Sequence, residues 1–404
     1  MQLFYYIIII FLIFFNNILL GDYMKILRND SKGLQVKYLQ ILLKNLNLYT
    51  GNIDGIFGNN TRNAVLTFQK NITIDETGIV DNSTWNALIP YAIVPTTIDY
   101  SYDIMMLNIQ RLILKYPFLD IGNIGLSVMK KNIPYIRLGF GNNHILYVGS
   151  THANEWITST VLMKFIEDFS EAYLKDDTIN NLNTKEIYES TSIFIVPMLN
   201  PDGVDLVVND IDTLSSEYIE AKKISQNYPT ISFPSGWKAN ISGIDLNLQF
   251  PAGWQQAKEI KYAQGYTTPA PRDFVGNFPL EAPEAIAIYD FTLSDNFNLM
   301  LTYHTQGEVI YWQFLDYNPP NAQKFGEIFS IASGYPLLET PYASSFAGFK
   351  DWFIQNFNKP GYTIEAGLGT NPLPISDFDK IYSDNIGILV YGAIPINEID
   401  QLIT

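Results

Sequence analysis

The chain has 404 residues, an apolar fraction of 47% and no cysteine, so it has room for two or three globular domains and excludes disulfides, thiolate metal ligands and cysteine nucleophiles. Its 25 basic and 41 acidic residues give a net charge of −16. Because such a chain repels polyanions and its sequence shows no local basic patch, we expect no nucleic acid partner.

The chain begins with an apolar segment over residues 1–20, whose length is typical of an export signal or a membrane anchor. Its first basic residue is Lys25, after the apolar segment, whereas an export signal usually carries its positive charge before it. Two interpretations stay open. Either residues 1–23 are a hydrophobic leader and the protein is secreted or associated with the cell wall or membrane, or translation starts at Met24 and the protein is cytoplasmic.

Residues 24–92 carry short helical patterns separated by turn residues, which predicts a small helical module. Val36, Leu39 and Leu43 share one helical face, and the turn 54–61 reads Asp-Gly-Ile-Phe-Gly-Asn-Asn-Thr. Other motifs of the module lie at 31–33, 64–69, 78–80 and 84–85. Together they resemble the peptidoglycan-binding domain with a three-helix fold. The resemblance implies peptidoglycan as a partner but not which side chains touch it.

Pro90 and Pro95 separate this module from a second domain, expected over residues 97–404, because prolines between periodic segments are typical of a boundary. Apolar runs of strand length there alternate with helical patterns, and no internal repeat is apparent in the chain. The runs are at 145–148, 193–196 and 299–303, and the helix has Ile157, Val161, Phe165 and Phe169 on one face. This alternation predicts an α/β sheet.

Two of the three histidines lie in positions that suggest a zinc site. His152 and Glu155 are three residues apart, and His304 ends the apolar run 299–303. Two imidazole nitrogens and one carboxylate leave the fourth position of a catalytic zinc ion open for water. His152, His304 and Glu365 each closely follow an apolar run, so they should converge where strands end. The sequence therefore suggests one Zn²⁺ per chain, although such spacing also fits histidines that are only hydrogen-bonded.

Several motifs within 97–404 resemble those of the zinc carboxypeptidase family in the same order. They lie at 151–158, 200–203, 243–247, 304 and 361–365. The resemblance implies an α/β fold with a mixed sheet, preceded by the small three-helix domain, and zinc held by His152, Glu155 and His304.

The same resemblance implies roles for two acidic residues. Asp245 would accept a hydrogen bond from His152 and fix its tautomer. Glu365, 14 residues after Asp351 (365 minus 351), would be the general base. The implied reaction is metal-assisted hydrolysis of an amide, in which Glu365 takes a proton from the attacking water and gives it to the leaving amine.

The chain departs from the family pattern where substrate is bound. Carboxypeptidases hold the C-terminal carboxylate with an Asn-Arg pair, whereas this chain has Asn247-Leu248. The family's nearby oxyanion-supporting arginine is also missing, and Lys238 is the only cation of its segment. We assign Asn247 and Lys238 to substrate binding and do not expect the activity of a C-terminal exopeptidase.

Two further substrate contacts are hypotheses. Tyr342, nine residues before Asp351, lies near the place where the family carries a mobile tyrosine, with simple packing as the alternative. Arg272 would supply the missing positive charge, either for the oxyanion or for a diaminopimelate carboxylate.

Segments at 237–240, 247–254 and 271–273 resemble the bacterial branch of the family that cuts γ-D-glutamyl-diaminopimelate bonds in murein peptides. A wall-binding module on the same chain fits that activity. The interpretation is a zinc-dependent peptidase acting on peptidoglycan stem peptides. Two alternatives are a metallocarboxypeptidase that trims proteins or peptides, and a catalytically inactive wall-binding protein. Retention of the three ligands and Glu365 argues against the last.

Overall fold

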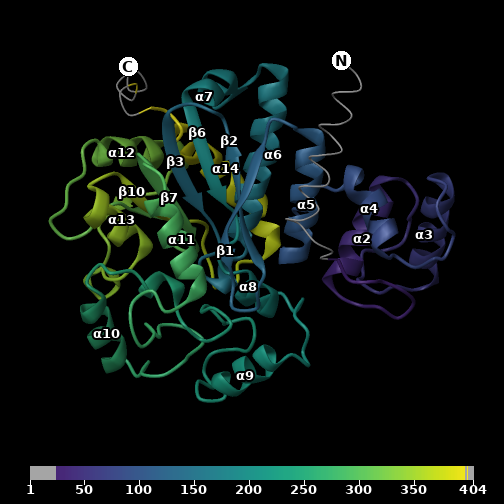
Figure 1. The fold of residues 1–404 in the computed structure, drawn as a ribbon, viewed down its shortest axis with the longest axis horizontal. Coiled ribbons are helices and arrows are strands. Elements are labelled where there is room, and N and C mark those ends of the chain that lie inside the picture. The colour runs from purple at the N-terminus through teal and green to yellow at the C-terminus, as the bar shows by residue number, and fades with distance from the viewer. Residues whose placement is uncertain (1–23, 396–397, 399–404) are drawn as a thin grey trace. The chain divides into compact units, whose positions relative to one another are not determined.

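The computed structural model describes residues 24–395 and 398, and the chain divides into two compact units (Figure 1). The first unit contains the residues up to 98 together with 103–118, and the second contains 99–102 together with the residues from 119 onward. Helix α5 (Tyr102–Lys115) thus groups mainly with the first unit, and the boundary near residue 97 stays a prediction.

The apolar segment 1–20 lies outside the described residues, so the interpretation of it as a leader or anchor stays a prediction. Within the described ranges, no helix combines the length and the apolar character that crossing a membrane requires.

The first unit is helical, as predicted. It consists of α2 (Leu34–Asn45), α3 (Asn59–Asn71), α4 (Asn82–Leu88), the short 3₁₀ helix η1 (Ile89–Tyr91) and α5. The predicted face with Val36, Leu39 and Leu43 is buried, because three and four residues of spacing place these side chains on one side of α2. The fold therefore agrees with the three-helix module expected from its motifs.

Two turns of the first unit are built alike, although no repeat is apparent in the sequence. Buried Gln40 accepts the N–H of Gly55 at 2.9 Å and donates through its amide nitrogen to Ile56 O at 3.2 Å. Buried Gln69 does the same with the N–H of Gly78 at 2.9 Å and with the next carbonyl at 2.8 Å. Each glutamine also donates to a buried threonine that follows the turn, Thr61 or Thr84. Each side-chain amide thus satisfies the N–H of a glycine and the next carbonyl within a tight turn.

The second unit contains a mixed sheet of eight strands in the order β1-β2-β6-β3-β7-β10-β8-β9. The strands are β1 (Asp120–Leu126), β2 (Asn132–Leu138), β3 (Asn143–Val148), β6 (Thr191–Val196), β7 (Leu299–His304), β8 (Val309–Tyr311), β9 (Leu337–Leu338) and β10 (Gly361–Glu365). Strands β6, β3, β7 and β10 are parallel neighbours, while β1, β2 and β8 pair in antiparallel fashion. The predicted runs at 145–148, 193–196 and 299–303 are confirmed as the central parallel strands.

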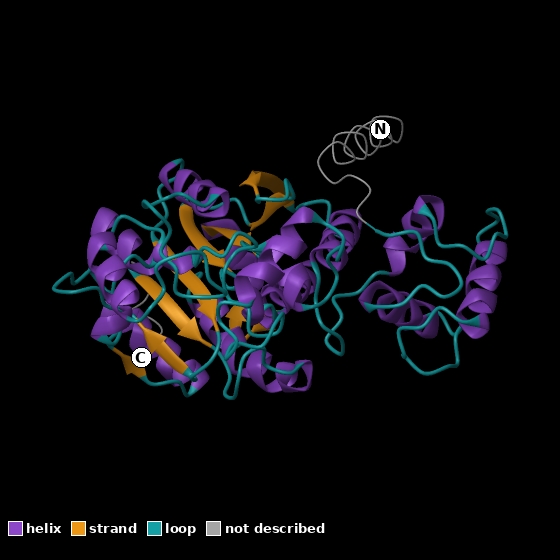
Figure 2. Ribbon diagram, turned by 90° about the horizontal axis from the view of Figure 1, so that it is seen from below, coloured by secondary structure: helices purple, strands orange, loops and turns teal. Residues whose placement is uncertain are grey.

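Helices cover both faces of the sheet (Figures 1 and 2). The helices of this unit are α6 (Ile157–Lys175), α7 (Thr184–Ser190), α8 (Pro201–Val207), α9 (Ser216–Ser225), α10 (Trp254–Ala263), α11 (Pro283–Leu293), α12 (Ala322–Ser333), α13 (Phe349–Phe357) and α14 (Phe378–Tyr391), of which α9 and α10 lie beyond the end of the sheet. Successive residues of β3 point to opposite faces, as strand geometry requires. Leu146 and Val148 join the core formed with α11 and α13, whereas Tyr147 packs against Phe165 of α6 and donates to Leu389 O of α14.

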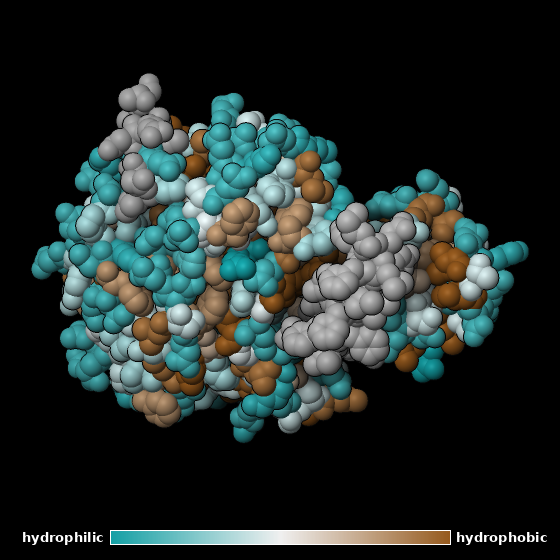
Figure 3. All heavy atoms as spheres, turned by 45° about the horizontal axis from the view of Figure 1, so that its top comes forward, coloured by the Kyte–Doolittle hydropathy of each residue, from teal (hydrophilic) through white to brown (hydrophobic). Residues whose placement is uncertain are grey.

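Short elements complete the second unit. They are the hairpin β4 (Thr178–Ile179) and β5 (Leu182–Asn183) and the 3₁₀ helices η2 (Ala153–Glu155), η3 (Leu246–Leu248), η4 (Tyr342–Ser344) and η5 (Ile375–Asp377). On the face that Figure 3 presents, hydrophilic side chains predominate over this unit, and hydrophobic ones form small groups between them.

Candidate metal and catalytic site

Three neighbouring parallel strands end at one place. His152 follows the end of β3 by four residues, His304 is the last residue of β7, and Glu365 is the last residue of β10. In the sheet register Glu365 pairs directly with His304. The three segments that the sequence predicted to converge therefore do so, because the carboxyl ends of parallel strands lie on the same edge.

His152, Glu155 and His304 form a compact, buried group. His152 Nδ1, His304 Nδ1 and Glu155 Oε2 lie 2.9 Å from one another in each pairing. The turn η2 brings Glu155 back under His152, its neighbour at the start of that turn. These three residues are the group of histidines and carboxylates in the described part of the chain whose ligand atoms could hold a metal ion.

The surrounding hydrogen bonds orient the two rings. Asp245 Oδ1 lies 3.1 Å from His152 Nε2, and Thr302 Oγ1 lies 3.0 Å from His304 Nε2. With the ring protons assigned to these outer partners, both Nδ1 atoms turn lone pairs toward the group. Asp245 is fixed in turn by the N–H groups of Asn247 and Asp273, at 3.2 Å and 3.1 Å.

The donor set fits a zinc ion. Three lone-pair donors facing one another at 2.9 Å repel unless a cation lies among them, and two imidazoles with one carboxylate suit zinc. Glu155 Oε1 is buried and accepts no hydrogen bond from the described residues, and its ionic partner Lys238 Nζ lies 3.4 Å away. Burial opposes ionisation of Glu155, but the charges of His152, Lys238 and His304 hold its pKa well below the usual range. The residues therefore present an ionised, incompletely satisfied group suited to a metal.

Glu365 has the properties of a proton-transfer group. Burial and then the charge of Glu155 raise the pKa of its carboxyl to about 7, with Lys238 and His152 acting in the opposite direction. Such a carboxyl can accept and release a proton near neutral pH.

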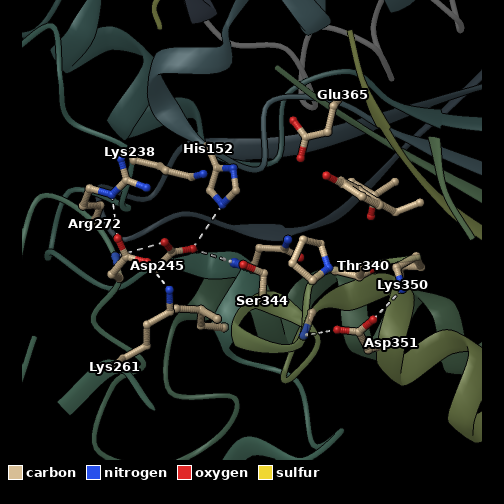
Figure 4. A pocket seen from close by; sticks show the side chains of 17 residues that line it. His152, Lys238, Asp245, Lys261, Arg272, Thr340, Ser344, Lys350, Asp351 and Glu365 are labelled. Carbon is tan, nitrogen blue, oxygen red and sulfur yellow. Dashed lines mark hydrogen bonds and ion pairs between the residues drawn. The ribbon is translucent and has the colours of Figure 1, made fainter. Parts of the chain in front are cut away.

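A pocket of about 230 Å³ is lined by His152 of the metal group and by Glu365 (Figure 4). Its lining includes six of the residues predicted from the sequence, namely His152, Lys238, Asp245, Asn247, Arg272 and Glu365. Asn247 also fixes the start of α13, since its Oδ1 accepts the N–H of Phe349 at 3.0 Å. Leu248 lines the pocket as well, at the position where the family pattern has arginine.

Tyr342 does not line the pocket. Its side chain is 71% exposed and packs edge-on against Phe346, with ring centroids 5.1 Å apart. Its neighbours Thr340, Pro341 and Ser344 do line the pocket, so its segment borders the site. A substrate contact by Tyr342 stays a prediction.

Sequence reasoning missed two lysines of the pocket. Lys261 Nζ lies 2.5 Å from Asp273, and Lys350 Nζ lies 2.6 Å from Asp351. Lys350 is almost fully buried in the first turn of α13, where the helix dipole disfavours a cation. The sequence signal that could have identified Lys350 is the occurrence of a lysine within the apolar pattern of residues 349–354. His144, by contrast, lies near the start of β3 and is hydrogen-bonded to Asp295 at 2.7 Å.

The motif at 200–203 holds two site loops together. Asn200 caps α8 by accepting the N–H of Gly203 and donates to Thr151 O at 3.3 Å and Ala239 O at 3.0 Å. It thus joins the loop before His152 to the loop that carries Lys238.

Comparison with known proteins gives two family matches. Residues 106–386 match the zinc carboxypeptidase peptidase model, and residues 32–88 match the putative peptidoglycan-binding domain. The chain is 47% identical over 294 residues to gamma-D-glutamyl-L-diamino acid endopeptidase 1 of Lysinibacillus sphaericus, covering 73% of this chain and 72% of that protein. It is also 37% identical over 285 residues to the uncharacterized protein YqgT of Bacillus subtilis (strain 168), covering 70% and 74% of the two chains.

Solved structures share the fold at low sequence identity. Bovine thrombin-activatable fibrinolysis inhibitor aligns with a TM-score of 0.57 at 16% identity, over 75% of this chain and 98% of that one. Carboxypeptidase A from Helicoverpa armigera aligns with a TM-score of 0.54 at 16% identity, over 91% and 98%. These likenesses support the predicted fold of a mixed sheet covered by helices.

Proposed function

The chain belongs to the zinc carboxypeptidase family, and from this we propose that it is a zinc-dependent peptidase that cuts γ-D-glutamyl-diamino acid bonds in peptidoglycan stem peptides. The observation that carries the proposal is the 47% identity, over most of both chains, to a protein named for that activity. The matching peptidoglycan-binding module on the same chain supports it.

In this proposal His152, Glu155 and His304 hold one zinc ion per chain. A bound zinc supplies Lewis acidity toward the scissile carbonyl and lowers the pKa of a coordinated water. Asp245 keeps the proton of His152 on Nε2, so that Nδ1 stays a ligand atom.

Glu365 performs the proton transfers. From the end of β10 its carboxylate takes a proton from the attacking water and then donates it to the nitrogen of the leaving amine. Lys238 lines the same pocket as an ammonium. Burial would lower its pKa, but the charges of Glu155 and Asp245 raise it, so the ammonium can stabilise negative charge on the carbonyl oxygen.

The pocket lacks the residue with which a carboxypeptidase binds the C-terminal carboxylate of its substrate. Leu248 offers no donor where a bidentate guanidinium would bind a free C-terminal carboxylate. Asn247 keeps its amide nitrogen for substrate while its oxygen holds α13.

Mass spectrometry of purified stem peptides incubated with the zinc-loaded chain tests the proposal. Cleavage between D-glutamate and the diamino acid supports it, provided Glu365→Gln lowers the rate of that cleavage by at least about 100-fold. Release of single C-terminal residues would favour the carboxypeptidase alternative, and absence of any cleavage would favour a wall-binding protein without activity.

We also propose the predicted organisation, a wall-binding module over 24–92 and a catalytic domain over 97–404, in a protein that is exported or membrane-associated. The support for export is the apolar length of residues 1–20. Peptide mass mapping of the native N-terminus tests it, because a mature chain starting at Met24 in the cytoplasm would contradict export.

A further inference from the structure

Three cations, Lys238, Lys261 and Arg272, line one end of the pocket together with the carboxylates of Asp245 and Asp273. Asp273 contacts two cations there: Arg272 Nε lies 2.6 Å from one carboxylate oxygen and Lys261 Nζ lies 2.5 Å from the other. Lys238 is next to them, since its N–H donates to Pro271 O at 2.7 Å. Lys238 is itself paired with Glu155 Oε1, at 3.4 Å. Of the three cations Arg272 has the most exposed side chain, 45% against 22% for Lys238 and 12% for Lys261, so it is the one most accessible to an anionic group of the substrate.

Arg272 is held in place with most of its donors unused. Its side chain is 45% exposed and lines the pocket. Only Nε donates to Asp273, and the terminal nitrogens make no hydrogen bond to any residue that the structure describes. A guanidinium with two free terminal N–H groups matches the two oxygens of a carboxylate.

Arg272 is also tied to the metal ligands. The N–H of Asp273 donates to Asp245 Oδ2 at 3.1 Å, and the other oxygen of Asp245 lies 3.1 Å from His152 Nε2. Two contacts thus connect the segment of Arg272 to a zinc ligand. A substrate group bound by Arg272 therefore has a defined position relative to the scissile carbonyl.

The position of Glu365 indicates which half of the substrate this end receives. In Figure 4 Glu365 lies on the opposite side of His152 from Arg272 and Lys238. Glu365 protonates the leaving amine in the proposed reaction, so the amine half lies on its side. The acyl half consequently extends toward Lys238 and Arg272.

We propose that Arg272 binds the free α-carboxylate of a γ-linked glutamyl residue on the acyl side of the scissile bond. This inference rests on the proposed function and names the feature by which the site would select its substrate. A glutamyl residue linked through its γ-carboxyl keeps an ionised α-carboxylate near the reacting carbonyl, whereas an α-linked residue has no main-chain carboxylate there. The pocket would accordingly prefer the γ-linked acid over the corresponding amide.

The test compares two tripeptides, L-alanyl-γ-D-glutamyl-diaminopimelate and its D-isoglutamine analogue, in which only the α-carboxylate is amidated. The wild-type chain should show a kcat/KM about 10- to 100-fold higher for the acid, the range expected of charge-assisted hydrogen bonds. Arg272→Gln should lower kcat/KM for the acid by that factor and leave the amide nearly unchanged. Arg272→Lys, which keeps the charge but not the paired N–H donors of the guanidinium, should retain part of the preference for the acid.

Arg137→Gln serves as the matched control, because Arg137 pairs with Asp120 at 2.9 Å and does not line the pocket. It should leave the preference for the acid intact. Zinc content and melting temperature of each variant show whether the site remains folded.

Equal losses on both substrates, or an unchanged preference in Arg272→Gln, would overturn the inference. So would an effect of Arg272 that disappears when the diaminopimelate carboxylate is amidated instead, which would place Arg272 on the amine side. If the wild-type chain cleaves neither tripeptide, the proposed function fails first, and this is seen before any variant is compared.

Discussion

The two units of this molecule differ in how completely their buried polar side chains are hydrogen-bonded. In the first unit Gln40 and Gln69 use both ends of their amides, and no buried side-chain polar atom of its described residues lacks a partner. In the second unit the short segment around the metal ligands leaves Thr151 Oγ1, Asn154 Oδ1 and Glu155 Oε1 buried without hydrogen bonds, although Lys238 Nζ forms an ion pair with the last at 3.4 Å. A polar network in which every buried group is hydrogen-bonded stabilises a fold, whereas buried groups without hydrogen bonds can still bind a ligand.

The largest expected effect comes from removing a metal ligand. His304→Ala should lose stoichiometric zinc and reduce hydrolysis to near the uncatalysed rate, because two remaining ligands hold the ion poorly. Metal analysis after dialysis and kcat/KM on stem peptides measure both. His144→Asn is the control, since the third histidine pairs with Asp295 away from the pocket and should keep both zinc and activity. Stoichiometric zinc in His304→Ala would contradict the assigned ligand set.

Removing the general base, Glu365, should slow the chemical step without affecting zinc binding or folding. Glu365→Gln should keep zinc and the fold but lower kcat by about 10²- to 10⁴-fold, the usual contribution of general acid–base catalysis. Single-turnover kinetics and metal analysis check the two parts. A kcat within tenfold of the wild type would show that another group moves the proton.

A change at Gln40 or Gln69 in the first unit should lower stability and leave catalysis unchanged. Gln40→Leu leaves the N–H of Gly55 without its buried acceptor and should destabilise the first unit by about 1–3 kcal/mol. Faster hydrogen exchange in α2 and α3 of the full chain would report it, and Gln69→Leu should give a similar result. Hydrolysis of soluble stem peptides should stay unchanged, so a loss of activity in either variant would contradict the assignment of these glutamines to folding.

The dependence of stability on pH concerns Glu284, which accepts hydrogen bonds from Val128 N at 3.0 Å and Asn240 Nδ2 at 3.1 Å. Burial raises the pKa of its carboxyl from 4.5 to about 7. Because the folded state holds the proton more tightly, its contribution to stability is complete below about pH 4.5 and is lost as pH rises through about 7. The loss is about 3 kcal/mol at most.

Denaturant unfolding of the full chain at several pH values between 5 and 8 measures this dependence. Glu284→Gln should remove the corresponding slope. A variant with the same pH dependence as the wild type would assign the titration to another group.

The elements that could be predicted from the sequence are those with a strong local pattern. Strands β3, β6 and β7 are buried on both faces and therefore read as continuous apolar runs, which also placed His152 and His304 at strand ends. The edge strand β1, which contains Gly122 and Gly125, has no such run and was not predicted.

The substrate side of the site was less predictable for a physical reason. Lys261 lies in α10 and Asp273 in the irregular segment that follows it, and their contact depends on how that segment folds back, so no local spacing indicates it. The similar turns around Gln40 and Gln69 were missed because the glutamines precede their glycines by 15 and 9 residues, and a repeat without a fixed period gives no sequence signal.

The central claim is that His152, Glu155 and His304, at the carboxyl ends of β3 and β7, hold the zinc ion with which the chain cuts a γ-glutamyl bond. The most direct test is to identify by mass spectrometry the new termini formed from L-alanyl-γ-D-glutamyl-diaminopimelate peptides with the zinc-loaded chain. The account predicts L-alanyl-D-glutamate and a free diaminopimelate amino terminus, lost on chelation and restored by zinc. An intact γ-glutamyl bond in the presence of bound zinc would contradict it.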